Sequence, residues 1–138
     1  EQMKRLPDLV EARNRWASLY TERLAAEPRI RTPRPPEGCR SNFQSYCVRL
    51  REATARERDE IVTRMRVARV QCTPGIQAIH RFTLYRQRYG EQPLPNTELA
   101  ADTTLILPLF PQMTAEQVEV AARTLIETVR AVLGRDAG

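Results

Sequence analysis

The side chain best suited to proton chemistry in this sequence is that of His80, the only histidine. An imidazole gains and loses a proton near neutral pH, so it can act as an acid, a base or a hydrogen-bonding switch. Arg81, Arg86 and Arg88 follow closely and could form an anion-binding site with it. Taken by itself, the segment favours a structural interpretation: a partly buried His80 bonded to a carbonyl beside aromatic neighbours such as Phe82, with solvated arginines. Both interpretations stay open at this point.

The remaining residues support no catalytic motif in this chain. Only five glycines are present, and none lies in a phosphate-binding pattern such as GxGxxG or GxxxxGK[ST]. There is no GxSxG nucleophile motif. The carboxylates of Asp59, Glu60 and Asp102 lie in segments expected to be helical or to cap helices, so their spacing does not argue for a catalytic pair.

The cysteines argue against both a metal site and a disulfide framework. Cys39, Cys47 and Cys72 are scattered without a CxxC pair, and the presence of only one histidine argues further against a zinc site. We therefore expect free thiols, as in a reducing compartment, and a cytoplasmic protein. No apolar run approaches the roughly 18 residues that a membrane-spanning helix needs.

Composition indicates one globular domain. The chain has 138 residues, of which 41% are hydrophobic and 28% charged. Its net charge is +5, with Lys4 as the only lysine. Along the sequence the arginines alternate with acidic residues, as in residues 56–60. Such interleaving is typical of solvated helix faces, whereas a nucleic-acid surface concentrates one sign of charge.

Periodicity predicts the elements that would position these side chains. Helices are expected over residues 6–26, 55–69 and 115–133, the last beginning with a capping box between Thr114 and Gln117. Strands are expected over residues 41–50, 70–73 and 103–107, and a loop over 28–40. Residues 76–89 fit either a helical turn or extended chain, of which helix is preferred. Asn96 is expected to cap a short helix to residue 101. The order predicts an α+β fold: a small three-stranded antiparallel sheet with helices packed on one face.

One long motif resembles a known family. Residues 94–114, LPNTELAADTTLILPLFPQMT, resemble the closing motif of the DegT/DnrJ/StrS family of sugar aminotransferases. Residues 45–50 resemble the first strand of the family's small domain, and residues 71–81 resemble a segment that approaches the active site and includes a histidine. Residues 13–20 fit the RxxxAxxY pattern of its interdomain helix. One departure is that Arg69-Val70 stand where the family usually has Gly-Ile, which removes the residue that most easily ends the preceding helix.

The resemblance implies a fold-type I aminotransferase that uses pyridoxal phosphate (PLP) to transfer an amino group from an amino-acid donor to a nucleotide-linked keto-sugar, in amino-sugar, polysaccharide or natural-product biosynthesis. Residues 1–26 would form an interdomain helix and residues 27–138 the C-terminal small domain. The Schiff-base lysine would belong to a large N-terminal domain absent from this chain, and the parent would be a homodimer. The chain alone would then bind no PLP, contain no catalytic residue and be inactive, while His80 and Arg81 would contact substrate.

Two other functions remain as alternatives. The positive charge could belong to a nucleic-acid-binding module, which would bind with a steep dependence on salt. The apolar helix faces could instead belong to a stand-alone interaction domain. We expect neither nucleic-acid binding nor membrane association.

Overall fold

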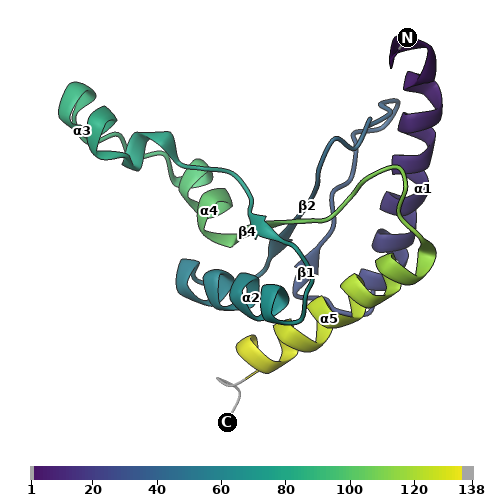
Figure 1. Cartoon of the computed structure of the whole chain (residues 1–138). Coiled ribbons are helices and arrows are strands. Elements are labelled where there is room, and N and C mark those ends of the chain that lie inside the picture. The colour runs from purple at the N-terminus through teal and green to yellow at the C-terminus, as the bar shows by residue number, and fades with distance from the viewer. Residues whose placement is uncertain (1, 135–138) are drawn as a thin grey trace.

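The computed structural model describes residues 2–134, which form an α+β domain (Figure 1). Four strands make one antiparallel sheet in the order β1-β2-β4-β3. They are β1 (Ile30–Arg31), β2 (Tyr46–Leu50), β3 (Thr73–Pro74) and β4 (Thr104–Leu107). The helical elements are η1 (Gln2–Arg5), α1 (Leu6–Leu24), α2 (Ala55–Val67), η2 (Ile79–Arg81), α3 (Thr83–Tyr89), α4 (Pro95–Thr103) and α5 (Ala115–Leu133). The predicted fold class is confirmed.

The central strands explain how the helices attach to the sheet. In β2 the buried residues Tyr46, Val48 and Leu50 alternate with Cys47 and Arg49, which are only half-buried. The buried residues join one hydrophobic core with side chains of α1, α2 and α5. Alternate side chains of a strand point to opposite faces, so the three long helices share one face of the sheet and Cys47 and Arg49 lie on the other.

The predicted strand number was wrong, because the sheet has four strands. The additional strand, β1, lies inside the segment predicted as a loop and pairs Ile30 with Leu50 and Arg31 with Arg49. Two residues are too few to show an alternating pattern in the sequence. Only its neighbour across the sheet identifies β1 as a strand.

Two predicted strands were also displaced. Residues 70–73 do alternate between buried and exposed, but ladder pairing with β4 begins only at Thr73 and continues through Pro74. Proline is tolerated there because β3 is an edge strand, where a missing N–H leaves no ladder bond unmade. Residues 41–45 form a turn before β2, with Phe43 in a left-handed conformation at φ 41°.

The predicted starts of the helices agree with the structure more closely than their predicted ends do. The capping box of Thr114 and Gln117 is confirmed, and the same arrangement starts α2 at Thr54 and Glu57. The assignment of Asn96 as a cap was wrong, since α4 begins at Pro95 with Leu94 as its cap residue. Helix formation in residues 76–89 is confirmed only in part, as the short helices η2 and α3.

Helix α2 ends in the left-handed turn that glycine usually makes, here made by Arg69. Arg69 has φ 62°, its N–H donates to the carbonyl of Arg66 at 2.9 Å, and the N–H of Val70 donates to the carbonyl of Met65 at 2.9 Å. This pair of bonds is the Schellman motif. The departure from glycine noted in the sequence therefore leaves the geometry of the turn intact and adds backbone strain, because a Cβ atom disfavours this conformation by about 1–2 kcal/mol.

We predict that Arg69→Gly raises the free energy of unfolding by about 1 kcal/mol, because it relieves that strain without removing either hydrogen bond. Urea denaturation of both proteins at neutral pH measures the difference. The matched control is Arg69→Ala, which removes the same side chain but keeps the Cβ atom. Equal stability of the Gly and Ala variants would contradict the interpretation.

Candidate functional site

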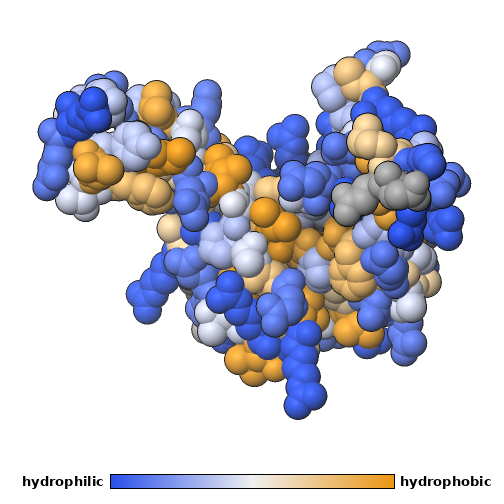
Figure 2. Space-filling model, turned by 45° about the horizontal axis from the view of Figure 1, so that its top comes forward, coloured by the Kyte–Doolittle hydropathy of each residue, from blue (hydrophilic) through white to orange (hydrophobic). Residues whose placement is uncertain are grey.

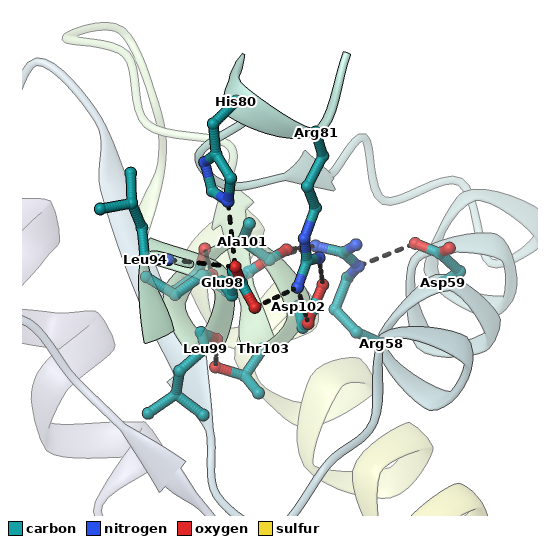
Figure 3. A network of polar contacts seen from close by, with 12 residues as sticks. Arg58, Asp59, His80, Arg81, Leu94, Glu98, Leu99, Ala101, Asp102 and Thr103 are labelled. Atoms are coloured by element: carbon teal, nitrogen blue, oxygen red, sulfur yellow. Dashed lines mark hydrogen bonds and ion pairs between the residues drawn. The ribbon is translucent and has the colours of Figure 1, made fainter. Parts of the chain in front are cut away.

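His80 and Arg81 lie side by side in η2 and both point toward α4 (Figure 3). Glu98 and Asp102 are separated by four residues on α4, so their carboxylates share one face of that helix. We call these four residues the His80 cluster. It joins two segments that the sequence separates by about twenty residues.

Arg81 makes the strongest connection in the cluster. Its Nη1 donates to Asp102 Oδ1 at 2.6 Å and its Nη2 to Asp102 Oδ2 at 3.0 Å. The Nη2 atom also lies 3.3 Å from Glu98 Oε2. A forked guanidinium–carboxylate pair fixes orientation as well as distance. Arg81 therefore sets the direction in which η2 leaves the body of the domain.

The contacts of Glu98 assign the hydrogen on His80. Glu98 Oε1 lies 3.1 Å from His80 Nε2 and accepts from the N–H of Leu94 at 3.2 Å. The hydrogen bond from His80, the N–H of Leu94 and Arg81 together lower the pKa of Glu98, so it is a carboxylate that only accepts. The Nε2 atom of His80 must then carry the hydrogen. Its Nδ1 atom is buried and has no hydrogen-bond partner among the described residues.

Arg58 supports the cluster from beneath. This residue of α2 is only 7% exposed, and its Nη1 donates to the carbonyls of Ala101 at 2.6 Å and Thr104 at 3.1 Å. These carbonyls lie at the junction between the end of α4 and β4, where helix carbonyls lack partners within the helix. Arg58 thereby holds α4 against α2 and the sheet.

The sequence predicted His80 and Arg81 as substrate contacts, which stays a prediction, and it did not predict the residues that bind them. Glu98 and Asp102 belong to the motif at residues 94–114, yet their role appears only when α4 lies against η2. The one signal that could have revealed them was their i,i+4 spacing in a helix opposite a basic segment. Arg86 and Arg88, the other members of the anion site considered from the sequence, lie on α3 and make no contact with the cluster in the interactions of the described residues; Arg86 lies 3.8 Å from Glu91.

A shallow pocket of about 360 Å³ adjoins His80 and is lined by Tyr85, Tyr89, Gly90 and Gln92. The two tyrosine rings stack with centroids 6.2 Å apart. Neither a lysine nor a carboxylate lines this pocket. Among the described residues, no group of three or more His, Cys, Asp or Glu side chains could hold a metal ion. No helix in the described part of the chain is long and apolar enough to cross a membrane.

The architecture defines the class of this protein: an α+β domain of the type found in sugar aminotransferases. The family model described as the DegT/DnrJ/EryC1/StrS aminotransferase family matches residues 1–125, and the chain belongs to this family. The aminotransferase TlmJ from Streptoalloteichus hindustanus is 30% identical, with a TM-score of 0.85 over 96% of this chain. Spr1654 from Streptococcus pneumoniae, described as a sugar aminotransferase, is 21% identical with a TM-score of 0.91 over 99% of this chain.

PseC from Helicobacter pylori, an aminotransferase involved in the biosynthesis of pseudoaminic acid, is 19% identical with a TM-score of 0.88 over 94% of the chain. In each of these three comparisons the chain spans only 35% of the solved relative. The family resemblance seen in the sequence is thus confirmed.

The family depends on PLP, and one solved structure of Spr1654 is its PLP form. The described residues do not fit this cofactor by themselves. Lys4, the only lysine of the chain, lies in η1 at the end of the molecule opposite α3 (Figure 1), away from the pocket beside His80. No residue that lines that pocket can form a Schiff base.

We predict that Asp102→Asn destabilises the domain by about 1 kcal/mol at pH 7, since the pair is partly exposed. The hydrogen bond from Arg81 lowers the pKa of Asp102 below its ordinary value of 3.8. A depressed pKa stabilises the folded state above the unfolded pKa, and this stabilisation is lost as pH falls through the folded pKa. The difference between wild type and variant should therefore be full at pH 7 and shrink below about pH 4.

Urea denaturation across this pH range measures the effect. Glu11→Gln, which removes an exposed carboxylate of α1, is the matched control and should change stability little at any pH. A deficit of Asp102→Asn that persists undiminished in acid would show that the Arg81 pair is not its cause.

Proposed function

We propose that this chain is the C-terminal small domain of a PLP-dependent aminotransferase that acts on nucleotide-linked keto-sugars with an amino-acid donor. The observation that supports the proposal is the difference between two coverages. Almost the whole of this chain matches each relative, but the match accounts for only 35% of the relative's own length. The proposal places residues 27–138 in the small domain and assigns residues 1–26 to the helix that connects it with a larger N-terminal domain. We further propose a cytoplasmic, homodimeric parent.

The surface of the arm formed by η2 and α3 supports this division. Figure 1 shows α3 projecting away from the body, and none of its residues is buried. Leu84 is 70% exposed and Tyr89 58%, although both are large apolar side chains. A seven-residue helix is marginal in water without packing. We infer that the rest of the parent covers this arm and the apolar side chains seen along it in Figure 2.

In this proposal His80 and Arg81 contact the substrate side of the active site that the two domains share. When bound, PLP would supply the electron-withdrawing ring for amino transfer, and residues outside this chain would hold it. His80 and Arg81 would orient the sugar or the amino donor, with Glu98 and Asp102 fixing their positions. A site that positions substrate to within a fraction of an ångström gains much of its rate from such orientation.

We predict that His80→Ala and Arg81→Ala in the full-length parent raise KM or lower kcat by tenfold or more, about 1.4 kcal/mol. Steady-state kinetics with the sugar and amino-donor concentrations varied separately would show which substrate each residue orients. Arg86→Ala is the control, because it removes an arginine from the same arm outside the His80 cluster. Unchanged kinetics in both variants would remove these residues from the active site.

A second prediction concerns the chain alone. Mixed with PLP and passed over a gel-filtration column, the 138-residue chain should retain no stoichiometric cofactor. Lys4→Arg should behave identically, because Lys4 belongs to η1, at the N-terminal end of the molecule, which lies opposite α3 (Figure 1). Stoichiometric PLP retention that Lys4→Arg abolishes would contradict the proposal that the cofactor-holding residues belong to another domain.

A further inference from the structure

A second concave surface, unrelated to the His80 cluster, lies on the sheet face that carries Cys47 and Arg49. Two adjoining hollows of about 260 and 310 Å³ share Pro33, Arg34 and Cys47. We call them together the basic groove, because four arginines and no carboxylate line them: Arg31, Arg34, Arg40 and Arg49. Within residues 28–51 the sequence has six arginines and one acidic residue, Glu37, which lines neither hollow.

The position of two of these arginines is electrostatically unfavourable. Arg31 and Arg49 are direct partners across β1 and β2, and both alternate with buried neighbours, so their side chains leave the same face of the sheet. Like charges directly opposite each other destabilise a sheet. Among the ion pairs of the described residues, none includes Arg31, Arg34, Arg40 or Arg49.

Several arginines outside the groove do pair with carboxylates. Arg29, immediately before β1, pairs with Glu27 at 2.9 Å, and Arg58 pairs with Asp59 at 2.7 Å. Arg81 pairs with Asp102. Some arginines outside the groove, such as Arg56 and Arg123, also lack an ion pair among the described residues. The basic groove differs from them because four such guanidinium groups line one concave surface that no carboxylate lines.

The turn that forms one end of the groove is held in a defined shape. Asn14 Nδ2 donates to the carbonyl of Ser41 at 3.0 Å, and the N–H of Phe43 donates to Ser41 Oγ at 3.0 Å. Phe43 adopts φ 41°, a conformation that costs a bulky residue about 1–2 kcal/mol, and its ring lies 6.2 Å from that of Tyr46. Backbone strain maintained by surrounding contacts is typical of ligand-binding segments.

We propose that the basic groove binds the diphosphate group of a small organic ligand. Arg34 lines both hollows, Arg31 and Arg49 line one, and Arg40 lines the other, so two linked phosphate groups would each have guanidinium donors with one shared between them. A guanidinium matches phosphate oxygens in pairs of parallel hydrogen bonds. Bound diphosphate would also remove the repulsion between Arg31 and Arg49. The proposal rests on these residues alone and does not depend on the aminotransferase role.

Isothermal titration calorimetry of the 138-residue chain with pyrophosphate tests the proposal. We expect saturable binding that weakens at least tenfold in the double variant Arg31→Gln/Arg49→Gln. The matched control is Arg123→Gln, an exposed arginine of α5 outside the groove, which should change affinity less than twofold. The proposal would be overturned if wild type showed no saturable binding of pyrophosphate. It would also be overturned if Arg123→Gln weakened pyrophosphate binding as much as a single substitution in the groove.

Thermal unfolding in low salt separates loss of binding from loss of fold. Arg31→Gln should unfold at a higher temperature than wild type without ligand, because it removes the repulsion across β1 and β2. A variant that binds less but is more stable cannot owe its defect to misfolding. A lower unfolding temperature for Arg31→Gln would contradict the unrelieved repulsion on which the proposal depends.

Further titrations identify the source of the diphosphate. Tighter binding of a nucleoside diphosphate than of pyrophosphate would support the proposal and assign a nucleotide-linked ligand, whereas equal affinity would support it and assign the diphosphate itself. The proposal would be overturned if orthophosphate bound as tightly as pyrophosphate. It would also be overturned if a single-stranded oligonucleotide bound more tightly than pyrophosphate and the nucleoside diphosphate, with a steeper salt dependence.

Discussion

The domain depends on a pair of stacked tyrosines between its first helix and its sheet. Tyr20 of α1 and Tyr46 of β2 are both fully buried, with ring centroids 5.0 Å apart. Each hydroxyl has a partner: that of Tyr20 donates to the carbonyl of Pro108 at 3.0 Å, and that of Tyr46 lies 2.8 Å from Thr21 Oγ1. Burial raises the pKa of Tyr46 to about 12, so both groups stay neutral hydrogen-bonding phenols at physiological pH.

This pair explains why α1 is part of the domain although it would serve as a connection in the parent. The carbonyl that Tyr20 reaches belongs to the chain segment that follows β4, and Trp16 donates to the carbonyl of Pro111 in the same segment at 3.3 Å. The LPLFP motif is therefore held in place by α1. A shift of α1 would move this segment, and with it the start of α5.

The arm is joined to the body of the domain by a different kind of interaction. Where α1 is attached by buried aromatic rings, η2 is attached by charge-assisted bonds to α4, and α3 beyond it has no buried residue. Such bonds orient a segment strongly but contribute little stability at a surface. The arm is thus directed by the domain without being buried in it.

The distribution of charged residues looks different along the sequence and in the folded structure. In segments such as residues 56–60, basic and acidic residues alternate, and this pattern indicated solvated helix faces. Residues 28–51, by contrast, contain six arginines and one acidic residue. In the structure, β1, β2 and the loop between them bring Arg31, Arg34, Arg40 and Arg49 around one groove. Glu27 pairs instead with Arg29 and Arg130, and Glu37 does not line the groove. Interleaved charges in one segment therefore do not exclude a basic surface formed by another segment.

The sequence by itself determined the helices with strong apolar periodicity, the cap at Thr114, the α+β class and the family, because these follow from local patterns and from one long motif. It also indicated that His80 and Arg81 belong together. Only the tertiary structure decided that β1 is a strand, that β3 begins at Thr73 and that Glu98 and Asp102 face the two basic residues. Each of these depends on a partner distant along the chain. A two-residue strand or an ion pair has no periodicity of its own, and exists only where folding brings its partner alongside.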